Sequence, residues 1–188
     1  FFFNGGSQLA FSTIADANAL GKIFVNTNMA AAGGLLGAMI VSKLWTKKVI
    51  LNVTLNGALA GLVVITADPY SPSPEFAVLY GALGGALIPM SMTLLEKWGI
   101  DDPVGAISVH GTAGILGLLL VPIFNSDASI LIQVLGIGVI GGFVFITSLG
   151  IWWVLHKTIG IRVGKEEESV GSDMYEGTGN AYPEFMDK

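Results

Sequence analysis

The sequence predicts an all-α membrane protein, a polytopic bundle of transmembrane helices, and three observations support this. Its 188 residues are 52% hydrophobic and only 12% charged, with a mean hydropathy of +0.69, whereas about 25% of residues are charged in a typical soluble domain. Five runs of at least 19 residues lack Asp, Glu, Lys and Arg, and a helix needs roughly 20 apolar residues to cross a bilayer. The 26 glycines are typical of closely packed membrane helices. This composition argues against a disordered chain, a nucleic-acid-binding domain and an ordinary soluble globule.

The charge-free runs predict about five complete spans plus the end of a sixth. The complete spans lie near 23–45, 49–67, 76–97, 103–124 and 128–157. Residues 1–15 begin with three phenylalanines and have no initiating Met, so we expect them to end a helix that starts further upstream, in a chain that is a fragment. Residues 1–160 then form the bundle, and residues 161–188, with three basic and seven acidic side chains, form a solvated tail.

Basic residues predict how the bundle lies in the membrane, because Lys and Arg gather in the cytoplasmic loops. The connections on one side carry only Lys22, whereas those on the other side, with the tail, carry seven basic residues: Lys43, Lys47, Lys48, Lys97, Lys157, Arg162 and Lys165. We therefore expect a multi-pass protein of the plasma membrane with a cytoplasmic C-terminus. The Pro-rich loop 68–74 then faces outside.

Glycines spaced four residues apart predict where the helices touch. Four of the five spans carry such a pair: Gly33 and Gly37, Gly57 and Gly61, Gly81 and Gly85, and Gly138 and Gly142. Lipid tails offer no hydrophobic gain for helix association, so close backbone contact at small residues must replace it. The pattern favours a compact bundle over loosely associated anchors.

His110 is the only ionisable side chain well inside a complete span. It lies seven residues beyond Pro103, which places it about 10 Å along the helix. An ionisable group within a membrane indicates a functional site by default, and an imidazole can donate, accept and carry a proton near neutral pH. A neutral histidine bonded to a backbone carbonyl or to a neighbouring helix fits equally well, and the residues leave both interpretations open.

The segment Ile100-Asp101-Asp102-Pro103 has the features of a helix start. We expect Asp102 to be the N-cap and Pro103 the first helical residue, with the carboxylate bonded to free amides. Adjacent carboxylates at a cap point in different directions, and no second acid pair accompanies them. The sequence therefore does not predict hydrolysis or any other enzyme activity.

Amide side chains within the spans predict hydrogen bonds between helices. Asn52 and Asn56 lie one helical turn apart, and the run Asn26-Thr27-Asn28 lies near the outer end of the first complete span. At the outer surface, Phe3-Asn4-Gly5-Gly6-Ser7 joins an aromatic ring to a hydroxyl across a glycine turn. Phe3 fits either an anchor at the membrane interface or a plug over an entrance.

Together these stretches resemble the C-terminal half of an ammonium transporter of the Amt/Mep/Rh superfamily. They occur in the family's order across nearly the whole chain. The segments that carry the resemblance are Phe3 to Ser7, Phe24 to Ala32, Asn56 to Thr66, Asp101-Asp102-Pro103 leading to Val109-His110-Gly111, Gly160 to Val163, and Asn180-Ala181-Tyr182.

The resemblance implies eleven transmembrane helices in two pseudo-symmetric halves and a homotrimer in which each subunit has its own pore. This chain would supply the end of the sixth helix and helices seven to eleven. Ser7 would help to recruit ammonium at an outer vestibule, Phe3 would belong to the aromatic gate below it, and His110 would be the second of two pore histidines. Asp102 would lie at the foot of that helix and Asn56 near the pore. The family uses no cofactor or metal, and relatives bind PII-type regulatory proteins at the cytoplasmic face.

Two positions depart from the family pattern. Phe2 stands where the family commonly has Gly, and Gly177-Thr178-Gly179 replaces a usual His-Gly-Glu, which puts regulation through the tail in doubt. The first pore histidine and the partner aromatic of the gate belong to the half that this chain does not contain.

We compare the transporter hypothesis with three alternatives. The first is an ammonium-sensing receptor of the same fold that signals through its cytoplasmic tail. The second is a membrane redox subunit with His110 and His156 as haem ligands, although their depths match poorly. The third is a purely structural bundle, which would tolerate His110→Leu.

Overall fold

The computed structural model describes residues 1–171, and every regular element in this range is helical. The chain divides into two units, Phe1–Gly138 and Val139–Lys188, which are described separately. The first unit contains α1 (Phe2–Gly6), α2 (Ile14–Thr46), α3 (Leu51–Thr66), α4 (Pro74–Lys97), the π-helix η1 (Ile107–Thr112), α5 (Ala113–Leu120) and the 3₁₀-helix η2 (Val121–Ile123). Helix α6 (Ile130–Thr158) crosses the boundary, and α7 (Lys165–Val170) belongs to the second unit. The segments 177–179 and 180–182 lie outside the described residues.

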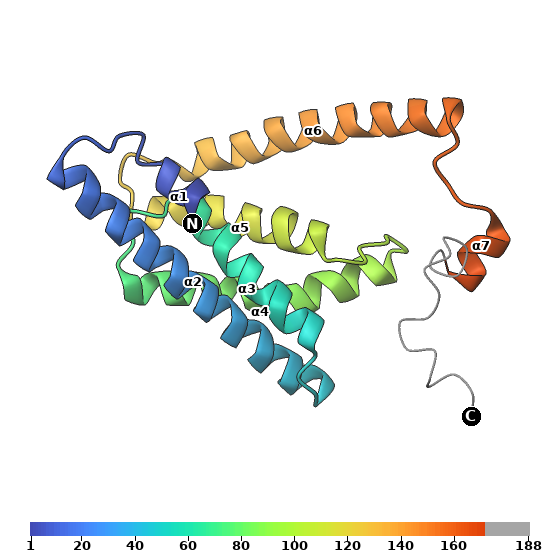
Figure 1. Cartoon of the computed structure of the whole chain (residues 1–188), viewed down its shortest axis with the longest axis horizontal. Helices are drawn as coiled ribbons and strands as arrows, with labels where there is room; N and C mark the ends of the chain where they lie inside the picture. Colours follow the sequence, from blue (N-terminus) through green and yellow to red (C-terminus); the bar gives the residue numbers. More distant parts are fainter. Residues whose placement is uncertain (172–188) are drawn as a thin grey trace. The chain divides into compact units, whose positions relative to one another are not determined.

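Three helices, α2, α3 and α4, form the core of the first unit. Helix α3 runs opposite to the other two, and all three pack against one another (Figure 1). Their contacts are made at glycine. A Cβ built on Gly85 would overlap the carbonyl oxygen of Gly34, and one built on Gly34 would overlap that of Gly57. Gly34 is therefore the point at which the three backbones meet.

Three of the four predicted glycine pairs are confirmed as helix contacts. Carbonyl oxygens of α4 cover Gly33 and Gly37, and residues of α2 cover both pairs on the other two core helices. Such an approach leaves no room for a side chain and replaces hydrophobic burial by direct backbone packing. Gly138 and Gly142 lie on opposite sides of the boundary between the two units, so the fourth pair stays a prediction.

Polar side chains fasten the connections at the two ends of this core. At one end, the buried Asn26 Nδ2 donates to the carbonyl oxygens of Pro69 and Pro72, at 3.0 and 2.9 Å. The predicted partner of Asn26 was another helix; the partner is instead the loop between α3 and α4, whose carbonyls no helix bond satisfies. At the other end, Ser42 Oγ donates to the Lys48 carbonyl at 3.1 Å, which closes the turn between α2 and α3.

Helices occupy all five predicted segments, with bounds that differ from the predicted ones. By length and apolar composition α2, α4 and α6 could each cross a membrane, whereas α3 and the segment Ile107–Ile123 are shorter. Helix α2 begins at Ile14 because Thr13 and Asp16 form a capping box, with Thr13 N–H donating to Asp16 Oδ2 at 2.9 Å. The Thr13 hydroxyl is the largest contribution that lowers the pKa of Asp16.

The second unit contains the end of α6 and the short helix α7. Arg162 donates from both Nε and Nη2 to the Glu168 carboxylate, at 3.1 and 2.6 Å. This pair raises the pKa of Arg162 and lowers that of Glu168. Because both side chains are exposed, the pair orders the segment locally and adds little to stability.

Candidate functional site

Ser7 and Phe3 lie at the end of the first unit where α2 begins. The buried Asn4 Nδ2 donates to Thr27 Oγ1 at 3.1 Å and thereby attaches α1 to α2. Phe3, the residue before Asn4, is 79% exposed. The Phe3 ring is therefore free to contact a membrane, another chain or a solute, and the anchor and gate hypotheses both stay predictions.

Ser7 lines a polar pocket of about 390 Å³. The pocket lies between the end of α1, the loop after α3 and the turn before α6, and it brings together residues far apart in the sequence. Its polar lining includes Ser7, Gln8, Thr66, Asp68, Ser71 and Asn125. Polar groups that converge in one concavity are the usual arrangement for binding a small polar ligand. We call this the outer pocket, after the side of the membrane on which the basic residues predict it to lie.

His110 lies within η1, the π-helix that precedes α5. A π-helix is rare and occurs frequently at functional sites, because its wider turn displaces one side chain from the regular helix face. His110 is exposed on the first unit, and within residues 1–171 its imidazole has no hydrogen-bond partner. No backbone carbonyl within residues 1–171 therefore satisfies the imidazole, and the interpretation of His110 as a histidine satisfied by a neighbouring helix stays a prediction.

Asp102 holds the start of this π-helix. One carboxylate oxygen accepts the N–H of Ile107 at 3.0 Å, and the other accepts the N–H and the hydroxyl of Ser108, both at 3.1 Å. The predicted position was wrong, since Asp102 is not directly followed by the helix. The N–H of Gly105, a residue with φ of +74°, donates to the Asp102 carbonyl and closes a turn. The helix begins only after this turn, at Ile107. The expected role, a carboxylate bonded to free amides, is confirmed across this turn.

We predict that Asp102→Asn destabilises the protein by about 1 kcal/mol at neutral pH. The amide nitrogen that replaces one carboxylate oxygen cannot accept the N–H that this oxygen binds, and one such hydrogen bond contributes about that much. Burial acts to raise the pKa of Asp102, but the amides of Ile107 and Ser108 outweigh it and lower the pKa. The carboxylate therefore stabilises the fold above its usual pKa, and this contribution disappears as the pH falls through the lowered value. Thermal unfolding in detergent at neutral and acidic pH measures the effect.

Asp101→Asn is the matched control, because it removes the same charge from a carboxylate that accepts no hydrogen bond in the described part of the chain. We expect the Asp102 variant to differ from wild type at neutral pH and to approach it in acid, whereas the Asp101 variant stays near wild type throughout. Equal unfolding temperatures for the two variants at neutral pH would contradict the capping role.

Asn56 connects α3 to this segment. Its Nδ2 donates to Asn52 Oδ1 at 3.1 Å, so the predicted bond between helices is instead a bond within one helix. The two positions are one turn apart on the same face, where their side chains meet before either reaches a neighbour. A Cβ built on Gly105 would lie 2.9 Å from Asn56 Nδ2. The amide pair therefore packs against the turn that leads to His110.

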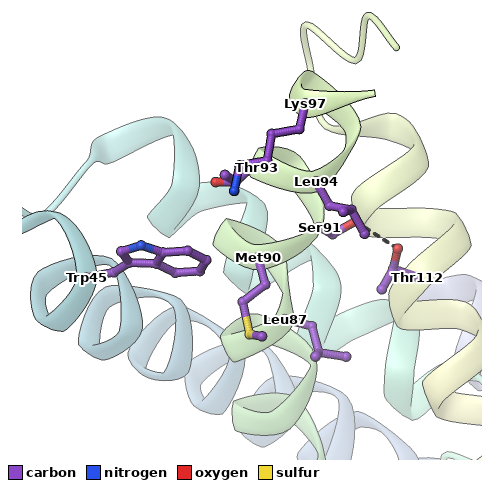
Figure 2. A pocket seen from close by; sticks show the side chains of 8 residues that line it. All are labelled: Trp45, Leu87, Met90, Ser91, Thr93, Leu94, Lys97 and Thr112. Atoms are coloured by element: carbon purple, nitrogen blue, oxygen red, sulfur yellow. Dashed lines mark hydrogen bonds between the residues drawn. The ribbon is translucent and has the colours of Figure 1, made fainter. Parts of the chain in front are cut away.

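A second pocket, of about 370 Å³, lies between α2, α4 and η1 (Figure 2). Trp45 lies opposite Met90 across it, and Ser91 and Thr112 are joined by a 2.9 Å hydrogen bond at its other side. Its lining is mainly apolar, and among the described residues Lys97 is the one charged side chain in it. This lining suits an aliphatic group better than a small cation, which distinguishes it from the outer pocket.

The structure separates the predicted site residues into two groups. Ser7 and Phe3 lie at the end of the first unit that carries the loop after α3, whereas Asp102 and Asn56 lie toward the opposite end, with His110 one turn into its helix.

Sequence reasoning missed Ser108, which has no recognisable motif, and the lining role of Asp68. Asp68 carried a signal, because an acidic residue directly after an apolar span is able to face a vestibule. Among residues 1–171, no three His, Asp or Glu side chains are placed to hold a metal ion.

Comparisons with known proteins cover almost the entire chain. The family model described as Ammonium Transporter Family matches residues 1–182. The chain is 37% identical to ammonium transporter Amt2 of Archaeoglobus fulgidus and to Amt2 of Methanocaldococcus jannaschii, with 99% and 97% of the chain covered. It spans 43% of the length of each of these relatives. A solved structure titled Sensor Amt Protein matches 93% of the chain and 45% of its own length, at 35% identity and a TM-score of 0.78.

Proposed function

Because the chain belongs to the ammonium transporter family and has its all-helical transmembrane fold, we propose that it forms part of a path for ammonium across a membrane. The observation that carries this proposal is the family match over residues 1–182, which includes every residue assigned to the path. The exposed His110 and the polar outer pocket support it, because they provide an imidazole and a hydroxyl where a solute can reach them.

The proposed path has two steps with different chemistry. Ammonium is recruited at the outer pocket by the Ser7 hydroxyl. Phe3, which does not line that pocket, belongs to an aromatic gate below it, since aromatic rings attract cations. The ammonium ion loses its proton and passes as ammonia along an apolar path beside His110. Transfer of a bare cation into low dielectric costs many kcal/mol, and a neutral solute avoids most of that cost. The imidazole of His110 bonds ammonia and carries the proton.

The proposed orientation and assembly follow the charges and the family. Lys43, Lys47, Lys48 and Lys97 lie at the end of the first unit opposite Lys22. We place that end and the C-terminus in the cytoplasm of a plasma-membrane protein. A homotrimer with one pore in each subunit and a PII-type regulatory protein as cytoplasmic partner are part of the same proposal.

Transport in cells tests the proposal. We expect the protein expressed from its complete gene to restore growth at limiting ammonium to cells that lack their own ammonium transporters, and to take up labelled methylammonium. Protein that reaches the membrane but supports neither growth nor uptake would contradict it.

An ammonium sensor is the second candidate, because the matching solved structure is titled Sensor Amt Protein. A sensor would bind ammonium at the same outer site and signal through residues 161–188. Removal of these residues should then abolish the ammonium response while ammonium binding persists. For a transporter, the same truncation leaves both binding and uptake measurable.

A further inference from the structure

The outer pocket holds a carboxylate to which neither the sequence patterns nor the family resemblance assigns a role. Asp68 follows the C-cap of α3, Ala67, and lines the pocket together with Ser7. Asp68 Oδ1 accepts the N–H of Ser71 at 3.0 Å, which fixes the carboxylate within its loop. Within residues 1–171, Oδ2 accepts only from Asn125 Nδ2, at the long distance of 3.5 Å. A carboxylate offers about four acceptor positions, so Asp68 retains capacity to accept from a ligand.

An aromatic ring in the same pocket already holds an ammonium group. The Nζ atom of Lys22 lies 4.5 Å from the centroid of the Tyr70 ring, well within the range of a cation–π contact. Tyr70 lines the pocket, and Lys22 belongs to α2 and reaches it from outside the lining. The Tyr70 ring therefore binds a primary ammonium group, and a free ammonium ion presents the same N–H donors without the aliphatic chain.

We propose that Asp68 and Tyr70 form an outer binding site for ammonium, next to Ser7, and that the Lys22 side chain occupies the Tyr70 face when the site is empty. The proposal rests on the proposed function, since it identifies where the transported cation first binds. The carboxylate supplies the charge and accepts N–H bonds, and the ring face binds the same cation from the other side. Lys22 acts as a tethered competitor that a high ammonium concentration displaces.

Two substitutions with opposite expected effects test the site. In cells, we expect Asp68→Asn to raise the apparent KM for methylammonium uptake by about 2- to 5-fold, the range of a partly exposed ion pair, with the maximal rate unchanged. Lys22→Met should lower the apparent KM, because it removes the competitor from the ring. Purified protein titrated calorimetrically with ammonium chloride against sodium chloride gives a second readout that does not require transport.

Asp127→Asn is the matched control. Asp127 lies near Asn125 at the same end of the unit but does not line the pocket. Asp127→Asn therefore measures the effect of removing one negative charge from this end without changing the pocket. If the Asp68 and Asp127 variants have the same KM and the same affinity for ammonium, the proposal that Asp68 belongs to an ammonium-binding site is wrong. Wild-type protein that binds ammonium through Asp68 but shows no uptake would overturn the proposed transport and leave the site standing.

Discussion

His110→Ala is expected to lower ammonium uptake by about 10- to 100-fold, or to abolish discrimination between ammonium and other cations. The range corresponds to the loss of a hydrogen-bond partner in a desolvated path, about 1–3 kcal/mol. The imidazole is exposed on a π-helix and has no hydrogen-bond partner among residues 1–171, so it is available to bind a solute. The measurement is labelled methylammonium uptake by cells, normalised to the protein present in the membrane.

His156→Ala is the control for this change, since it removes the same side chain from the last turn of α6, outside the proposed path. We expect that variant to transport as wild type does. His110→Ala with unchanged uptake and unchanged selectivity would contradict the pore assignment and would favour a purely structural bundle. His110→Gln keeps a donor and an acceptor but cannot carry a proton, so it separates hydrogen bonding from proton transfer.

The helical segments were predictable because a membrane imposes a strong constraint on composition. Charges are excluded from spans, so the absence of Asp, Glu, Lys and Arg located all five helical segments. Helix ends were harder, because hydropathy does not determine where backbone hydrogen bonding starts. Helix α2 extends well beyond the expected span to Ile14, where Thr13 and Asp16 cap it. That capping box was readable in the sequence.

The candidate site was predictable in its residues but not in its geometry. His110 and Asp102 were identified from their position in an apolar run and from the family resemblance. The π-helix depends on how the turn at Gly105 places the Asp102 carboxylate against amides five and six residues later, and no local pattern encodes that. Asp68 and Ser7 share a pocket only because α1 and the loop after α3 are both fastened to α2. Such long-range contacts become visible only in the folded chain.

Gly85→Ala should destabilise the protein by about 1–3 kcal/mol, the usual cost of forcing extra atoms into a packed interior. Elsewhere in a helix the same exchange would stabilise by up to about 1 kcal/mol. At Gly85 the added methyl would fall well inside 3.0 Å of the Gly34 carbonyl oxygen, and backbone cannot yield as a flexible side chain does. The α2 and α4 backbones must therefore separate, which weakens the contact at which all three core helices meet.

Gly21→Ala provides the comparison, because Gly21 also lies in a helix but a Cβ there would meet no atom within 4 Å. We expect thermal unfolding in detergent to shift to lower temperature for Gly85→Ala and to stay level or rise for Gly21→Ala. If the same Gly→Ala exchange shifts the unfolding temperature in opposite directions at the two positions, the loss of stability at Gly85 comes from the backbone contact and not from helix propensity. If both variants unfold at the same temperature, the glycine contact does not hold the core, and the helices must associate through their larger apolar side chains.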